Sequence, residues 1–265
     1  MDETFKIAET PQRDYRDYIA AKLGMWLFLI TEFFLFIGPF LLYSVYRYKF
    51  PQDFQSASAG LNIPLAGLNT VILLTSSITI TLAIAAVKKG RNRLGLILLG
   101  LTVILGVSFL LIKYLEWSAE ISRGIYPGSP ALLTRSSGEV IFYGLYFFMT
   151  GLHGLHIAGG IVLIKVMMLQ IIRGKIHQND YIQLENSGLY WHLVDIIWIY
   201  LFPLFYLGWM SFFANILISS FIALLVLLYL MHLRSEKGVL RLIVPISIII
   251  LFILAGMVFS DVAFR

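Results

Sequence analysis

The sequence contains no cysteine, and this absence excludes several kinds of chemistry. Without thiolates the chain cannot form a disulfide, an iron–sulfur cluster, a thiolate-bridged copper centre or a c-type haem attachment. Charged residues are also scarce, at 13% of the 265 residues, whereas 59% are hydrophobic. Because soluble domains carry about 25% charged residues, this composition indicates an integral membrane protein.

The predicted fold is an all-α, polytopic membrane protein, and its mean hydropathy is +0.84. A helix needs about 20 apolar residues to cross the hydrocarbon core of a bilayer. Seven segments are long enough: 22–46, 62–87, 94–113, 140–172, 186–209, 212–233 and 239–260. The first follows a charged segment rather than the terminus itself, so we do not expect a secretory signal peptide. The fourth is unusually long, and Lys165 within it is expected to extend to the cytoplasmic interface.

The distribution of basic residues predicts the orientation of these spans. With the amino terminus inside, cytoplasmic segments hold thirteen Lys or Arg residues and the opposite side holds six. This excess predicts a cytoplasmic amino terminus and an external carboxyl terminus. The basic residues lie in short loops beside apolar helices, so they are topology signals and do not indicate nucleic acid as a partner.

Several polar residues fall inside predicted spans. Glu32 lies deep in the first span, where a carboxyl group either binds a partner or stays protonated. It could serve a proton relay or a lipid headgroup, or it could be a neutral acid bonded to another helix. Hydroxyl residues are frequent in the second span, where they usually join helices to one another. Lys113 and Glu116 end the third span and are predicted to pair at the outer interface, anchored by Tyr114 and Trp117.

The motif Gly151-Leu-His-Gly-Leu-His156 places His153 and His156 on one helix face, with glycines that let another helix approach. Two histidines of one helix cannot both ligate the same haem iron axially. A three-histidine copper or zinc site with His192 is geometrically possible, with Glu32 and Asp195 as supporting carboxylates. The favoured interpretation is that the chain binds no metal.

A second polar motif, Tyr190-Trp-His-Leu-Val-Asp-Ile-Ile-Trp198, lies in the fifth span. Its spacing predicts a hydrogen-bonded pair between His192 and Asp195, which are three residues apart. The pair could relay protons, or it could form a structural network with Trp191. The structural interpretation is favoured.

Taken in order, these residues resemble subunit III of the haem-copper respiratory oxidases. The matching blocks are Leu23-Gly-Met-Trp-Leu-Phe-Leu-Ile-Thr-Glu-Phe-Phe34, Leu68-Asn-Thr-Val-Ile-Leu-Leu74, the region from Tyr114 to Glu116, Thr150-Gly-Leu-His-Gly-Leu-His156, and the Tyr190–Trp198 motif. Two amino-terminal helices of longer family members are missing, so the core resembles the five-helix bacterial form. In the longer form those helices complete a phospholipid cleft, so lipid binding by Glu32 and the histidines is not carried over intact.

The resemblance implies an accessory subunit without a redox centre, in a proton-pumping terminal oxidase that reduces oxygen to water. Haem and copper are then expected in partner subunits I and II, with direct packing on subunit I and possible supercomplex partners. Glu32, His153, His156 and Glu116 become candidates for proton uptake or phospholipid contact. The expected location is the bacterial cytoplasmic membrane, and the electron donor, cytochrome c or a quinol, is left open.

The last two predicted spans resemble the end of bacterial oxidase subunit IV, on the residues Leu230-Met-His-Leu-Arg234, Leu240-Arg-Leu-Ile-Val244 and Ser260-Asp261. The chain is therefore predicted to be a fusion. Residues 1–21 would form a cytoplasmic segment, 22–211 a five-helix subunit III-like domain, and 212–265 a two-helix subunit IV-like segment.

Three alternatives remain at this point. A related accessory protein of nitric oxide reductases would share most of these motifs. An independent ion-coupled transporter is disfavoured because the sequence has no inverted repeat or broken helix pair. An integral haem protein that uses His153 and His192 would show a Soret band in the isolated chain.

Overall fold

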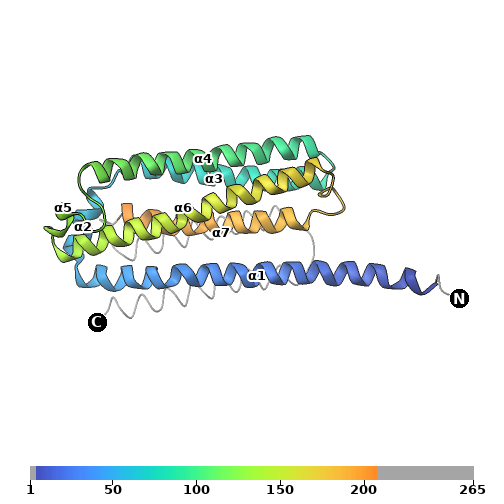
Figure 1. Cartoon of the computed structure of the whole chain (residues 1–265), viewed down its shortest axis with the longest axis horizontal. Coiled ribbons are helices and arrows are strands. Elements are labelled where there is room, and N and C mark those ends of the chain that lie inside the picture. Colours follow the sequence, from blue (N-terminus) through green and yellow to red (C-terminus); the bar gives the residue numbers. More distant parts are fainter. Residues whose placement is uncertain (1–3, 208–265) are drawn as a thin grey trace.

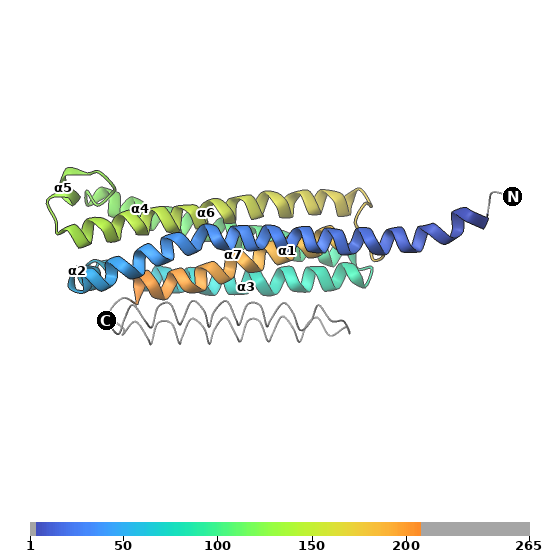
Figure 2. The same cartoon turned by 90° about the horizontal axis from the view of Figure 1, so that it is seen from below.

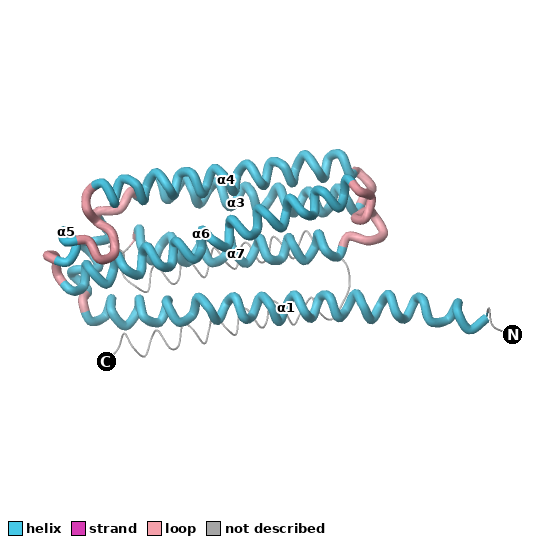
Figure 3. The backbone as a smooth tube through the Cα atoms, viewed as in Figure 1, coloured by secondary structure: helices cyan, strands magenta, loops and turns pink. Residues whose placement is uncertain are grey.

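The computed structural model describes the backbone of residues 4–207 and the side chains of residues 19–207. This part is helical, without a strand: α1 Thr4–Lys49, α2 Pro51–Ala59, α3 Ile63–Lys88, α4 Asn92–Ser122, α5 Pro130–Leu133, α6 Ser137–Ile172 and α7 Ile182–Tyr206. The five long helices run side by side, and the short α2 and α5 lie together at one end of the bundle (Figure 1). Figure 3 shows that the loops gather at the two ends.

Five of the described helices are long and apolar enough to cross a membrane, and they correspond to the first five predicted spans. The all-α prediction is confirmed for the described residues. The predicted spans 212–233 and 239–260, and therefore the count of seven and the position of the carboxyl terminus, lie outside them. The short helix α2 was not predicted, because its nine residues carry no apolar period.

Side-chain caps and glycines determine where several helices begin and end. The Asn62 side chain accepts a hydrogen bond from the Leu65 amide at the start of α3, and the Ser136 hydroxyl accepts one from the Glu139 amide at the start of α6. Gly90 follows α3 with φ of 71°, a left-handed conformation that glycine adopts without steric cost. The two caps therefore mark where α3 and α6 begin, and Gly90 marks the turn after α3.

Helix α4 extends beyond the predicted third span, which ended at Lys113. Helix α4 continues to Ser122 because the charged residues in its last turns are sheltered rather than exposed. Lys113, Glu116 and Glu120 are all nearly fully buried. A hydropathy pattern treats such residues as the end of a span, whereas here they face the interior of the bundle.

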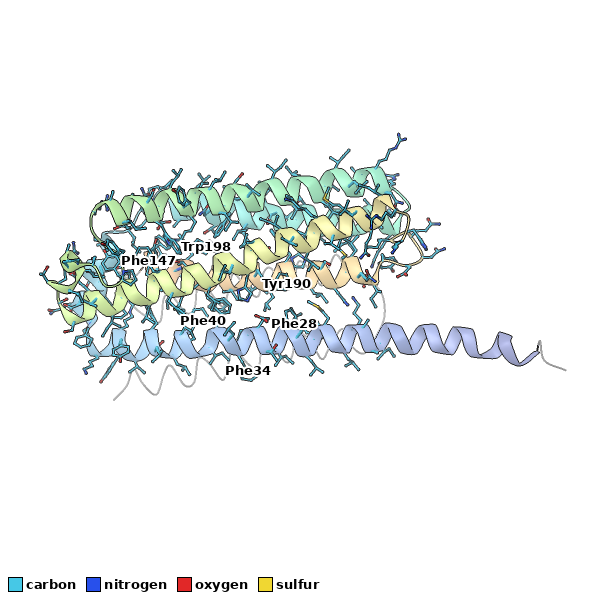
Figure 4. All side chains as sticks on the ribbon, viewed as in Figure 1. Phe28, Phe34, Phe40, Phe147, Tyr190 and Trp198 are labelled. Atoms are coloured by element: carbon cyan, nitrogen blue, oxygen red, sulfur yellow. The ribbon has the colours of Figure 1, made fainter. Side chains whose placement is uncertain are left out.

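Helix α7 is the most enclosed of the five, with 72% of its most apolar segment buried, against 11% for α1. It packs against α3, α6 and α1, while α3 and α4 form the most extensive helix pair. Helix α1 therefore lies at the edge of the described bundle (Figure 1), and in the view from below it runs in front of α7 (Figure 2). Phe34 of α1 points away from the bundle, and Phe28 approaches Tyr190 of α7 (Figure 4).

Two glycines make room for the largest side chain in the core. The Trp191 indole is fully buried and lies against Gly106 of α4 and Gly160 of α6. A Cβ at either glycine would lie 2.8 Å from an indole carbon, closer than packed side chains approach. The absence of a side chain at these two positions therefore allows three helices to meet around one tryptophan.

Candidate functional site

The two histidines of α6 lie in different environments, although they are one helical turn apart. His156 points toward α1, where its Nε2 lies 2.7 Å from Oε2 of Glu32. His153 points into the bundle and is fully buried. The shared helix face that the sequence predicts therefore does not give the two rings the same contacts.

The Glu32–His156 contact has a defined proton arrangement. His156 Nδ1 lies 2.7 Å from the Leu152 carbonyl oxygen, which can only accept, so Nδ1 must carry a proton. The contact between Nε2 and Oε2 then contains one further proton, shared by an imidazolium and a carboxylate or by a neutral imidazole and a carboxylic acid. The two forms differ only by the position of that proton.

This pair is partly sheltered and fixed from several directions. The side chains of His156 and Glu32 are 12% and 19% exposed. The Phe36 ring meets the imidazole edge-on with centroids 5.3 Å apart, and the Tyr190 hydroxyl donates to the His156 carbonyl oxygen at 3.1 Å. Residues of α1, α6 and α7 therefore surround one exchangeable proton inside the membrane-spanning part of the chain.

His153 is held by aromatic rings instead of hydrogen bonds. Its ring stacks on Trp198 with centroids 5.3 Å apart, and Phe109 meets it edge-on at 5.4 Å. Neither ring nitrogen has a hydrogen-bond partner among the described residues. Figure 4 shows Trp198 pointing into the bundle from α7.

Lys113 and Glu116 form the predicted ion pair, with Nζ 3.2 Å from Oε2, but the pair lies in the bundle interior. The two residues are 4% and 2% exposed, so other helices enclose the pair, and its setting at the outer interface stays a prediction. Tyrosines from two other helices complete the site, since Tyr146 and Tyr206 donate to Glu116 Oε1 at 2.7 and 2.6 Å. The two tyrosine hydroxyls satisfy the Glu116 carboxylate, which explains how the bundle interior tolerates the charged pair.

The two aromatic residues predicted to anchor this pair, Tyr114 and Trp117, lie in different environments. Tyr114 is 68% exposed, as a residue of an interfacial belt would be. Trp117 instead packs on Phe147, with ring centroids 5.2 Å apart, and against Gly151.

The predicted hydrogen bond between His192 and Asp195 is not formed. His192 Nδ1 lies 2.7 Å from the Ser77 hydroxyl of α3, and Nε2 lies 3.3 Å from that of Thr81. Neither Asp195 oxygen has a hydrogen-bond partner among the described residues, although Ser77 lies close to it. Helix α3 presents hydroxyl groups to this face of α7, so His192 bonds across the interface instead of along its own helix.

Trp191 also bonds to α3, since its Nε1 donates to the Ser76 hydroxyl at 2.9 Å. Trp198 does the same to the Thr70 hydroxyl at 3.0 Å. The hydroxyls of the second predicted span thus join α3 to α7.

Three buried polar residues that bond to other helices were not predicted from the sequence: Glu185, Tyr146 and Tyr206. Glu185 accepts from Lys22 of α1 and Lys88 of α3, each at 2.6 Å, and so joins three helices at one end of the bundle. Tyr146 and Tyr206 complete the Lys113–Glu116 site. No local pattern marks these residues, because each partner comes from a different helix.

The described residues contain no group of three or more His, Cys, Asp or Glu side chains that could hold a metal ion. His153, His156 and His192 are separated by their different partners. A copper or zinc site built from these three histidines is therefore not assembled in the described bundle.

Comparison with known proteins gives one family. Residues 16–212 match the family model described as cytochrome c oxidase subunit III. Subunit 3 of cytochrome bo(3) ubiquinol oxidase from Pseudomonas aeruginosa is 32% identical over 185 residues, which cover 69% of this chain and 83% of the relative. A probable quinol oxidase subunit 3 from Staphylococcus saprophyticus is 30% identical over 191 residues, or 72% and 90% of the two chains. Cytochrome c oxidase subunit 3 from Synechocystis is 31% identical over 185 residues, or 69% and 74%.

Proposed function

Because this chain belongs to the cytochrome c oxidase subunit III family, as the match over residues 16–212 shows, we propose that it supports proton uptake and lipid organisation beside subunit I. It is an accessory subunit of a haem-copper terminal oxidase and a multi-pass membrane protein. The complex is an oxidoreductase. In our proposal the chain itself holds no redox centre, and haem and copper belong to partner subunits I and II.

The Glu32–His156 pair is the observation that carries this proposal. It holds one exchangeable proton between α1 and α6, in a region that is 12 to 19% exposed. Transfer of this proton between the carboxyl group and the imidazole leaves the net charge of the pair at zero. Release of the proton to a neighbouring acceptor leaves the Glu32 carboxylate beside a neutral imidazole, with a net charge of −1, and uptake of a proton restores the neutral pair.

The same pair has a structural function, since it is a polar contact between α1 and α6. Helix α1 is the least enclosed of the five described helices that are long enough to span a membrane. Loss of the contact therefore removes one polar link between α1 and α6 together with the proton site, while α1 keeps its ion pair from Lys22 to Glu185. We assign His153 to packing around Trp198, and Glu116 to the buried ion pair of α4.

Replacement of Glu32 tests the proposal. In the purified oxidase, Glu32→Gln should leave the initial rate of oxygen reduction intact while it speeds inactivation during turnover or slows proton uptake. Asp180→Asn, which changes an exposed loop carboxylate, is the matched control. Unchanged turnover, unchanged decay and unchanged proton uptake in Glu32→Gln would show that Glu32 is only structural.

The fusion is a separate part of the proposal. The family match ends at residue 212, beside the predicted boundary between 211 and 212, which supports a different origin for residues 212–265. We assign these residues to a subunit IV-like segment, and the complex to a bacterial cytoplasmic membrane. Gentle purification should then yield subunits I and II with this chain and no separate subunit IV. Recovery of a full-length subunit IV would contradict the fusion.

A further inference from the structure

Tyr146 of α6 and Tyr206 of α7 bind a proton acceptor that Tyr43 and Tyr190 lack. Both phenols donate to Oε1 of Glu116, at 2.7 and 2.6 Å, the short distances of hydrogen bonds to an ionised acceptor. Tyr43 and Tyr190 donate to backbone carbonyl oxygens instead. A carboxylate becomes a carboxylic acid when it takes up a proton, whereas a backbone carbonyl oxygen only shares one. Glu116 can therefore accept the whole phenol proton.

This proton acceptor favours the loss of an electron from the phenols. A phenol that loses one electron becomes strongly acidic, so its oxidation is easiest where a bound base removes the proton at the same time. Lys113 holds the base in place, because its Nζ lies 3.2 Å from Oε2 of Glu116, and it also donates to the oxygens of both phenols. The ammonium group therefore continues to bind the phenol oxygen after the proton has moved to Glu116.

The two phenols and Trp198 form a row of rings in the bundle interior. The ring centroids of Tyr146 and Tyr206 are 6.3 Å apart, and those of Tyr206 and Trp198 are 6.4 Å apart. All three residues are fully buried or nearly so. Phenol and indole rings lose an electron more readily than aliphatic or amide side chains, and the chain has no thiol that would lose one first. Close contact lets an electron pass from ring to ring, and burial keeps an oxidised ring away from water.

We propose that Tyr146 and Tyr206 are a redox-active pair that reduces oxygen-centred radicals, which an oxygen-reducing complex can release from partially reduced oxygen. One phenol gives an electron to the radical, so that a hydroxyl radical becomes a hydroxide ion. The phenol O–H bond breaks, and its proton forms the O–H bond of the Glu116 carboxylic acid. The product is a neutral tyrosyl radical. The cluster, which was neutral before, then carries the positive charge of Lys113.

The tyrosine pair is separate from the other sites proposed for the complex. It needs no bound cofactor and is not a step in the electron path from donor to oxygen, so haem and copper stay assigned to subunits I and II. It shares no residue with the Glu32–His156 pair, on which the proposed function depends. Formation of a tyrosyl radical and turnover of Glu32→Gln are measured independently, so either proposal can fail alone.

Flash oxidation of the intact complex tests the pair. Ser118→Cys, at an exposed position of α4 two residues after Glu116, is labelled with a ruthenium photo-oxidant. The complex with the wild-type chain, which has no cysteine, is treated in the same way and shows what labels on other subunits contribute. After a flash in the presence of an electron acceptor, freeze-trapped samples are examined by electron paramagnetic resonance. We expect a neutral tyrosyl radical whose spectrum narrows with ring-deuterated tyrosine, and which forms more slowly in D2O.

Three variants of the labelled chain make the result specific. Tyr146→Phe combined with Tyr206→Phe removes both phenols and should abolish the radical. Glu116→Gln keeps both phenols but replaces the base by a carboxamide that cannot take up the proton, and should also abolish it. Tyr114→Phe removes a phenol that is 68% exposed and lies one helical turn before the label, and should leave the radical unchanged. The rate in D2O needs no substitution at the pair, so it decides even where a variant fails to assemble.

Three outcomes would overturn the proposal. One is a tyrosyl radical of the same size after both phenols of the pair are replaced. Another is loss of the radical in Tyr114→Phe, because the exposed phenol would then be the oxidised group. The third is equal rates of radical formation in H2O and D2O, because proton transfer to Glu116 would then not accompany the loss of the electron.

Discussion

Lys113 and Glu116 are oppositely charged residues within the membrane-spanning part of α4, where an isolated charge would be costly. Each is stabilised by the other and by tyrosines from α6 and α7, and the Lys113 ammonium lies 4.6 Å from the centre of the Tyr146 ring. At the residue scale, burial of these charges depends on partners from three helices at once.

Removal of one member of the Lys113–Glu116 pair should therefore lower the stability of the chain. Lys113→Met leaves the Glu116 carboxylate buried without its cation, and should destabilise the chain by about 3–5 kcal/mol. Lys165→Met, on an exposed position of α6, is the control and should have little effect. The measurement is the temperature at which the chain dissociates from the purified complex, and equal temperatures for the two variants would contradict the buried pair.

The two histidines of α6 should respond differently to the same substitution. His156→Phe removes the partner of Glu32, and should cost about 1–3 kcal/mol and loosen the chain's attachment to the complex. His153→Phe replaces a ring that makes only aromatic contacts among the described residues, and should cost less than about 1.5 kcal/mol. Subunit retention after detergent washing compares them, and equal loss from both variants would show that His153 has a polar partner.

At the scale of helices, close approach around Trp191 determines how α4, α6 and α7 assemble. The indole fits between Gly106 and Gly160, and its Nε1 bonds to Ser76 on α3. Four helices thus converge on one side chain. This arrangement explains why glycines, which weaken a helix in water, are used in the core of this bundle.

A methyl group at one of these glycines should disturb the contact. Gly160→Ala would place Cβ 2.8 Å from the indole, and should destabilise the chain by about 1–3 kcal/mol. Gly144→Ala on the same helix meets nothing within 4 Å and should be nearly neutral. Thermal dissociation of the complex distinguishes them, and a neutral Gly160→Ala would mean that Trp191 can shift without loss.

At the scale of the whole molecule, the described bundle has a basic end. The α3–α4 and α6–α7 loops carry Lys89, Arg91, Arg173 and Lys175 at the end opposite to α2 and α5 (Figure 1). From the positive-inside rule we expect this end to lie in the cytoplasm.

Cysteine labelling tests this orientation, because the chain has no cysteine of its own and any label found on it reports the introduced residue. In intact cells a membrane-impermeant maleimide should label Thr134→Cys, in the loop after α5. It should label Lys89→Cys only after the membrane is permeabilised. The reverse pattern would invert the predicted topology.

Local properties of the chain were enough to predict the membrane class, the first five spans, the family and the absence of thiol chemistry. These properties are hydropathy, composition and the order of the motifs. Helix packing alone showed that His156 is the partner of Glu32, that Lys113 and Glu116 are buried, and that His192 bonds to Ser77 instead of Asp195. The reason is that spacing along a helix defines a face, whereas the helix that packs against that face determines which groups meet.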